Sequence, residues 1–383
     1  MRGSGLGVRY VDIAWPPAWR HFNTIRGRHY LATGRAALAN NHIGEANVAL
    51  NLAYEFDPSN YEAGLTLAQI WQSGQAARSD QIYVRLLRDH PTEASQTARA
   101  WAQALLWRGD FGSLAALAGA RLVNEPPPGA AWLHALIFSA RRLHDPGLLA
   151  AALAAPNLPA ETRSILRLEA AALGGDAAGT ARILTTPLSD TASAYARYYQ
   201  VNFLTEAGQA ARALELLTGY GDKLPPDERI ILSCAAQARL GNQAVVRSEA
   251  EALLRANPKP RMYEILAAHL IRYPDAELLR LTCGQIATMP WAYQPEGSAA
   301  NAALLCAAGI NRVPALLDAN RTRLRRTLGT KAAALNRADN VFNSDADTRQ
   351  LGNFLPALPM LPLEVVYSLF SVDPAAPRQR RQP

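Results

Sequence analysis

The sequence contains little cysteine and little lysine. Its three cysteines, Cys234, Cys283 and Cys306, lie far apart and form no C-x-x-C pair, so we predict neither a disulfide framework nor a zinc site. Lysine occurs at only three positions, and the net charge of +7 therefore comes from arginine. An arginine-rich, lysine-poor composition is what GC-rich coding produces in bacteria. It permits an acidic partner, which arginine would bind through paired hydrogen bonds, but does not require one.

Long apolar runs are also missing. No uninterrupted run reaches the roughly 18 residues that cross a bilayer, and the N-terminus lacks a basic start followed by an apolar stretch. On these grounds we expect a cytoplasmic protein. Residues 1–5 resemble an expression leader, however, so we also allow for a membrane-associated protein whose N-terminal anchor has been removed.

The common catalytic motifs are absent as well. The chain has no H-E-x-x-H, no G-x-S-x-G, no G-x-x-x-x-G-K-[ST], and no strand followed by G-x-G-x-x-G. Its seven histidines are dispersed, and no two of them stand three or four residues apart on one helix, the spacing that metal ligation favours. We therefore predict that the protein is not an enzyme and has no catalytic residue, no metal ligand and no cofactor.

What the sequence does contain is alanine and leucine in a helical pattern. Hydrophobic residues make up 49% of the chain and charged residues 19%, a composition that favours a folded protein over a disordered one. Runs of β-branched residues and alternating apolar and polar stretches are scarce. This pattern predicts an all-α protein.

Segments of 33 to 35 residues recur along the chain, and helix breakers stand at the same places in each. Each has an apolar helix, a short break, a second apolar helix and a closing proline. The interval from the glycine at the break to that proline is 17 residues in four copies: Gly74 to Pro91, Gly109 to Pro126, Gly208 to Pro225, and Gly241 to Pro258. Two looser copies break at 144–145 and 174–175, and a further pair over 261–290 has Pro274 where the glycine is expected.

The first copy, residues 27–60, resembles the tetratricopeptide repeat. That consensus has an aromatic residue at position 4, small residues at positions 8, 20 and 27, a large apolar residue at 24 and proline at 32. Here these positions hold Tyr30, Gly34, Ala46, Ala53, Leu50 and Pro58. The resemblance implies an α-solenoid of antiparallel helix pairs that forms a right-handed superhelix. Small residues at the helix crossings would allow the two helix axes to come close together.

The repeats divide the chain into four predicted regions. Residues 1–26 form an N-terminal arm that lies near a membrane or packs on the first pair, and residues 27–295 form an array of about eight pairs. Residues 296–350 form capping helices, expected at 297–309 and 313–337. Residues 351–383 form a proline-rich extended strap on the last helices, followed by a disordered tail.

In this family the first helices of the pairs line a concave face that binds protein segments, so the resemblance implies a non-enzymatic protein–protein interaction scaffold. The repeat register then gives a set of candidate partner-binding residues. They are Arg28, Arg35, Tyr61, Trp71, Gln72, Arg99, Gln103, Trp107, His134, Phe138, Arg141, Arg142, Tyr195, Tyr198 and Asn202, with Gln96 and Glu206 on the same face. This arginine, amide and aromatic surface would suit an extended peptide with acidic and apolar residues.

Other interpretations remain open. Trp71, Trp107 and Phe138 could pack as ordinary core, and Arg99, Arg141 and Arg142 could form a solvated face. An enzyme or carbohydrate-active protein could place its site at the junction of array and cap, near His269, Tyr273, Trp291 and Tyr293. Nucleic acid could bind the arginines of the capping helix, Arg312, Arg321, Arg323, Arg325, Arg326 and Arg337, although no aromatic residues are interleaved with them to stack on bases.

Overall fold

The computed structural model describes residues 19–40, 42–124, 130–176, 180–181, 184, 187–329, 335, 358 and 360–372. Within these residues the protein is entirely helical, with eighteen α-helices, four short 3-10 helices and no strand. The chain divides into two compact units, Met1–Arg108 and Gly109–Pro383. The predicted array of residues 27–295 thus spans two units, and the boundary coincides with Gly109, a predicted turn glycine. None of the described helices is both long enough and apolar enough to span a membrane.

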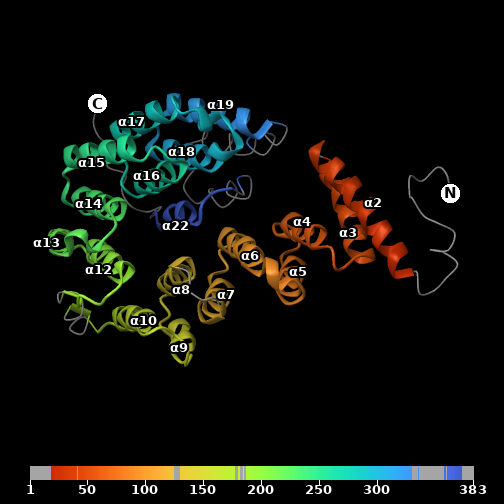
Figure 1. Cartoon of the computed structure of the whole chain (residues 1–383), viewed down its shortest axis with the longest axis horizontal. Helices are drawn as coiled ribbons and strands as arrows, with labels where there is room; N and C mark the ends of the chain where they lie inside the picture. The colour runs from red at the N-terminus through yellow and green to blue at the C-terminus, as the bar shows by residue number, and fades with distance from the viewer. Residues whose placement is uncertain are drawn as a thin grey trace. The chain divides into compact units, whose positions relative to one another are not determined.

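Among its described residues, the first unit contains five α-helices that pack in chain order (Figure 1). They are α2 (Trp19–Ala39), α3 (Ile43–Phe56), α4 (Tyr61–Trp71), α5 (Ala76–Asp89) and α6 (Ala94–Arg108). Each helix contacts the next, and α4 also contacts α6. Helix α2 begins at Trp19, so residues 19–26 of the predicted arm belong to the same helix as the start of the first repeat. No proline lies between Trp19 and Ala39, and the helix therefore continues through this segment.

Two helix crossings of the first unit depend on glycine. A Cβ atom on Gly34 of α2 would lie 2.7 Å from Cγ of Leu50 on α3. A Cβ atom on Gly64 of α4 would likewise lie 2.7 Å from the ring of Tyr54. Because real Cβ contacts are longer than this, a larger residue at either position would push the helices apart.

The second unit contains thirteen α-helices within the described residues. They are α7 (Phe111–Asn124), α8 (Ala130–Leu143), α9 (Gly147–Leu153), α10 (Ala160–Leu173), α12 (Ala194–Glu206), α13 (Ala210–Tyr220), α14 (Pro226–Leu240), α15 (Gln243–Ala256), α16 (Pro260–Arg272), α17 (Ala276–Ile286), α18 (Ser298–Asn311), α19 (Pro314–Leu328) and α22 (Leu363–Ser371). Alternate helices touch: α8 contacts α10, α10 contacts α12, and α12 contacts α14, while α15 contacts α17 and α17 contacts α19.

Three of the predicted turn glycines lie between helices in a left-handed backbone conformation. Gly109, Gly208 and Gly241 have φ angles of +71°, +81° and +84°, a backbone conformation that side chains disfavour. The turn at Pro274 has no glycine. There Asp275 caps α17 by accepting hydrogen bonds from the backbone N–H groups of Glu277 and Leu278, so the aspartate starts the second helix of this pair.

Two predictions for the C-terminal region are wrong. Helix α19 ends at Leu328, and Arg312 precedes it in a left-handed conformation, so the six arginines do not share one helix. Arg323 is buried, and its guanidinium contacts the side-chain oxygens of Asn301 and Asn320. Arg337 lies outside the described residues.

The predicted extended strap is a helix over Leu363–Ser371. Pro362 occupies the N-cap position, and no proline follows it within the segment, so the helix starts as soon as the proline run ends. This helix, α22, packs on α16, a helix of the last predicted pair of the array (Figure 1). The predicted disordered tail, residues 374–383, lies outside the described residues.

Candidate functional site

An open hollow in the first unit brings three register-derived residues together. It has a volume of about 470 Å³ and lies between α4 and α6. Its lining consists of Leu65, Gln69, Ser95, Gln96, Arg99, Ala100 and Gln103. Gln96 and Arg99 are exposed, whereas Gln103 is half-buried. Two exposed polar side chains, a half-buried amide and a leucine thus face one depression.

Polar contacts beneath this hollow fix α6 in place. The indole N–H of Trp101 donates to Asp80 of α5 at 2.7 Å, and Arg108 binds the same carboxylate at 2.7 Å. The hydroxyl of Thr97 lies 3.1 Å from that of Tyr61 on α4. Tyr61, a predicted binding residue, therefore contributes to the support of α6. Trp107 is buried, with 9% of its surface exposed, so it belongs to the core.

The remaining predicted residues of the first unit lie elsewhere. Trp71 lines a second hollow, of about 760 Å³, formed mainly by α3 and α5, where its N–H donates to Asn47 at 2.6 Å. Arg35 is paired with Glu62 on an exposed surface. Arg28 is exposed on α2, and Gln72 is half-buried at the C-terminal end of α4. The predicted partner-binding residues of the first unit therefore lie on more than one surface.

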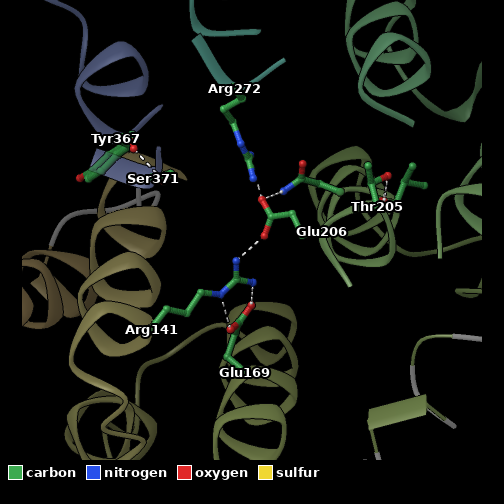
Figure 2. Close-up of polar contacts among 9 residues, drawn as sticks. Arg141, Glu169, Thr205, Glu206, Arg272, Tyr367 and Ser371 are labelled. Carbon is green, nitrogen blue, oxygen red and sulfur yellow. Dashed lines mark hydrogen bonds and ion pairs between the residues drawn. The ribbon is translucent and has the colours of Figure 1, made fainter. Parts of the chain in front are cut away.

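In the second unit, Arg141 and Glu206 form the centre of a charged network (Figure 2). Arg141 of α8 pairs with both oxygens of Glu169 on α10 and also with Glu206 on α12. Arg272 of α16 donates to Glu206 at 3.1 Å, and Asn202 donates to the same carboxylate at 3.1 Å. Four helices are thereby joined by two arginines and two carboxylates.

Burial affects the two carboxylates of this network differently: it outweighs Arg141 at Glu169 and raises the pKa of that carboxyl, but it is itself outweighed at Glu206. The side chain of Glu169 is only 1% exposed. Burial alone would raise the pKa of Glu206, but Arg141 and Arg272 outweigh it and lower this pKa to about 2. Burial would likewise lower the pKa of Arg141, and its two carboxylate partners raise it instead. The predicted partner-binding residues Arg141 and Asn202 therefore have partners inside the unit.

Helix α22 covers the surface next to this network. The ring of Tyr367 stacks on His134 at 4.6 Å and lies 4.9 Å from Phe138, measured between ring centroids. Arg142 donates to the backbone oxygen of Phe370 at 3.3 Å. His134, Phe138 and Arg142 were predicted to contact a partner, and here they contact a helix of the same chain.

A small cavity remains beside α22, with a volume of about 270 Å³. It is lined by His134, Ile137, Phe138, Arg141, Arg142, Glu206, Arg272, Tyr367, Ser368 and Ser371. Arginine predominates among its charged residues. Two further predicted residues, Tyr195 and Tyr198, are half-buried on α12, and burial raises the pKa of each; for Tyr198 it reaches about 12.

Residues at the predicted junction of array and cap contact their own chain. His269 is buried, and burial, assisted by Arg272, lowers its pKa to about 4. Trp291 packs against Tyr263 and donates its N–H to the backbone oxygen of Pro258 at 3.1 Å. The described residues contain no group of three or more histidine, cysteine or acidic side chains arranged to hold a metal ion. An enzymatic site at this junction stays a prediction.

Sequence reasoning missed the roles of Glu169, Arg272 and α22. A weak signal for Glu169 exists, because it is the one acidic residue within the apolar stretch 165–173 and a buried acid needs a cation. Nothing near residue 141 in the sequence indicates which acid would meet it.

Comparison with known proteins adds no assignment. No protein-family model matches this chain, and no curated protein matches it at a significant level. The class that the structure itself defines is an all-helical protein of two units, built from successive helices that pack in chain order.

Proposed function

We propose that this chain is a non-enzymatic scaffold of the tetratricopeptide type, an α-solenoid of antiparallel helix pairs that binds a protein segment. Two observations support the architecture. Alternate helices contact one another, as stacked pairs require, and glycines allow the close crossings within pairs. Each pair would bury its apolar face against the next pair, and the first helices would form the binding face.

The observation that carries the functional proposal is the hollow between α4 and α6. Gln96, Arg99 and Gln103 occupy positions that the repeat register assigns to the binding face, and all three line this one depression. Leu65 and Gln69 of the preceding first helix complete it. Residues from two successive first helices therefore contribute to a single surface.

The side chains of this hollow suit an extended peptide. Glutamine amides both donate and accept hydrogen bonds, so they can pair with an exposed peptide backbone. Arg99 supplies a charge-assisted donor for a carboxylate, and Leu65 and Ala100 offer apolar contact. We therefore propose a ligand segment that carries an acidic residue next to a small apolar residue.

Selection from a displayed library of random peptides, with the full chain as bait, tests this function. We expect enrichment of acidic sequences and expect Arg99→Glu to weaken the selected peptides by at least about tenfold, because the introduced carboxylate repels the ligand. Affinity would be measured by fluorescence anisotropy with the full chain.

Arg78→Glu is the matched control. Arg78 is exposed on α5 and lines the other hollow of the first unit, so this variant makes the same charge change on a different surface. Its affinity should stay within about twofold of the unmodified chain. Equal losses in the two variants would indicate nonspecific attraction to a basic protein, and failure to enrich any peptide would also contradict the function.

A further inference from the structure

Helix α22 reaches a face of the second unit from a distant part of the sequence. Its contacts on α8 are to residues more than 220 positions earlier, including the bond between Arg142 and Phe370, which are 228 positions apart. The other contacts of α22 are to α16 and to Phe111 at the start of α7. Both α8 and α16 are first helices in the repeat register. The chain thus places its own helix on the face that the register assigns to partners.

Aromatic side chains dominate the contact with α8. Tyr367 lies against His134 and Phe138, with centroid distances of 4.6 and 4.9 Å. One turn further along, Phe370 meets Phe111 of the neighbouring helix α7 edge-on, with 6.1 Å between the ring centroids. Residues three apart lie on one side of a helix, so Tyr367 and Phe370 form a single aromatic edge. This is the manner in which an amphipathic helix occupies a groove.

Charge complements the aromatic edge at both ends of α22. Glu364 stands in the first turn and pairs with Arg261 of α16 at 2.6 Å. Burial would raise the pKa of Glu364, but Arg261 outweighs it and lowers this pKa. At the other end, the Arg142 side chain donates a hydrogen bond to the backbone oxygen of Phe370. Acid at the start of a helix and a cation at its end also suit the helix dipole.

The interface between α22 and its neighbours has an unsatisfied polar group and a cavity. The hydroxyl of Tyr367 is buried and has no hydrogen-bond partner, which costs free energy. The cavity of about 270 Å³ lies beside this ring and contains Arg141, Arg142 and Arg272 in its lining. A docked helix with a more complete set of polar contacts would therefore bind this face better than α22 does.

We infer that α22 is a resident ligand of a helix-binding face formed by α8 and α16, and that a partner helix of the same chemistry displaces it. The partner would present an acidic residue followed at the third and sixth positions by aromatic residues, as Glu364, Tyr367 and Phe370 do. This inference deepens the proposed scaffold function, on which it rests, but it concerns a different surface. Attachment to the same chain gives α22 a high effective concentration at this face. It therefore leaves the face only when a partner helix competes for it.

A labelled peptide of residues 360–373 tests this inference in the full chain. Glu364→Arg should release α22, because the new arginine faces Arg261, while it leaves the α8 and α16 surface unchanged. We expect the Glu364→Arg chain to bind the native peptide at least about tenfold more tightly than the unmodified chain does. Anisotropy gives the affinity, and circular dichroism confirms that each variant is folded.

A charge swap provides the matched control. The double variant Arg261→Glu with Glu364→Arg restores an ion pair of opposite polarity, so α22 should dock again and peptide binding should return to the low level of the unmodified chain. The single variant Arg261→Glu should bind the Glu364→Arg peptide in preference to the native one. A general loss of structure would not reverse specificity in this way.

Several outcomes would overturn the inference. If the Glu364→Arg chain unfolds at a lower temperature and still fails to bind the peptide, α22 is a permanent part of the core. Formation of dimers by this variant, with no peptide binding, would make α22 of a second copy the occupant instead of a partner helix. Because Arg99 is not part of this test, failure here leaves the outcome of the library selection unaffected.

Discussion

The two units place the same repeat positions in contrasting surroundings. In the first unit, Gln96 and Arg99 are exposed around an open hollow. In the second unit, Arg141 is bound by two carboxylates, and His134 and Phe138 lie beneath α22. The difference lies in the neighbouring first helices. The α4 side of the first hollow offers Gln69, whereas α10 and α12 supply Glu169 and Glu206. An arginine at such a position stays exposed or forms an internal ion pair, depending on whether the neighbouring first helices supply carboxylates.

The contrast predicts a large difference between two carboxylate substitutions. Glu169→Gln removes the bidentate partner of Arg141, which is 35% exposed and keeps Glu206, and we expect it to reduce the stability of α8 and α10 by about 2 kcal/mol. Glu62→Gln removes an exposed partner of Arg35, and we expect no measurable change. Native-state hydrogen exchange, resolved by peptide, measures both. Equal effects of the two substitutions would refute the distinction between paired and open surfaces.

Acid should weaken the second unit through His269. Its pKa in the folded protein is about 4, below the ordinary value of 6.5, so the unfolded chain binds a proton that the folded chain does not. Stability is complete above pH ~6.5 and falls as the pH drops toward ~4, with a loss of about 2 kcal/mol between pH 7.5 and pH 5. Hydrogen exchange of α16 over this range should show the loss.

The variant His269→Gln removes the contribution of His269, while His134, whose pKa burial also lowers, keeps its own. The stability of the variant is lower at neutral pH because the packing changes, but its pH dependence between pH 7.5 and pH 5 should become shallower. Glu206, with a pKa of about 2, does not interfere, because its contribution is lost only below its ordinary value of 4.5. An unchanged slope in this variant would assign the pH dependence to other groups.

The smallest expected effect concerns the crossing of α2 and α3 in the first unit. Gly34→Ala places a methyl group within 2.7 Å of the Leu50 side chain, and we expect a loss of about 1–2 kcal/mol. Gly44→Ala makes the same change on α3, where no atom lies within 4 Å, and should be neutral or slightly stabilising. Urea unfolding measures both variants. If Gly34→Ala is as stable as Gly44→Ala, the glycine is not needed for close packing.

Local features of this fold were predictable from the sequence. Helix pairs, the turn glycines and the packing of Gly34 against Leu50 depend on residues close in the chain, and their spacing repeats. The helical state of α22 was missed because the prolines before it favour an extended chain, although Pro362 occupies the position immediately before the helix. Pro362 therefore marks the start of the helix and does not prevent the residues after it from being helical.

The candidate site was predictable only in part, because its decisive contacts are long-range. Arg141 meets Glu206 across 65 positions and Arg272 meets Glu206 across 66. Such distances depend on how successive helices are rotated relative to one another, and small deviations from the consensus change that rotation. The repeat register placed Gln96, Arg99 and Gln103 around one hollow. It did not separate Trp107, which is in the core, from residues at the surface.

Thiol labelling most directly tests the claim that one face is open and the other is occupied by α22. The three native cysteines are buried, so a single engineered cysteine can be followed in the full chain. We predict that Gln96→Cys reacts nearly as fast as an unprotected thiol, whereas Phe138→Cys reacts slowly and becomes fast when Glu364→Arg is added. Rapid labelling of Phe138→Cys without that second substitution, or continued protection with it, would contradict the account.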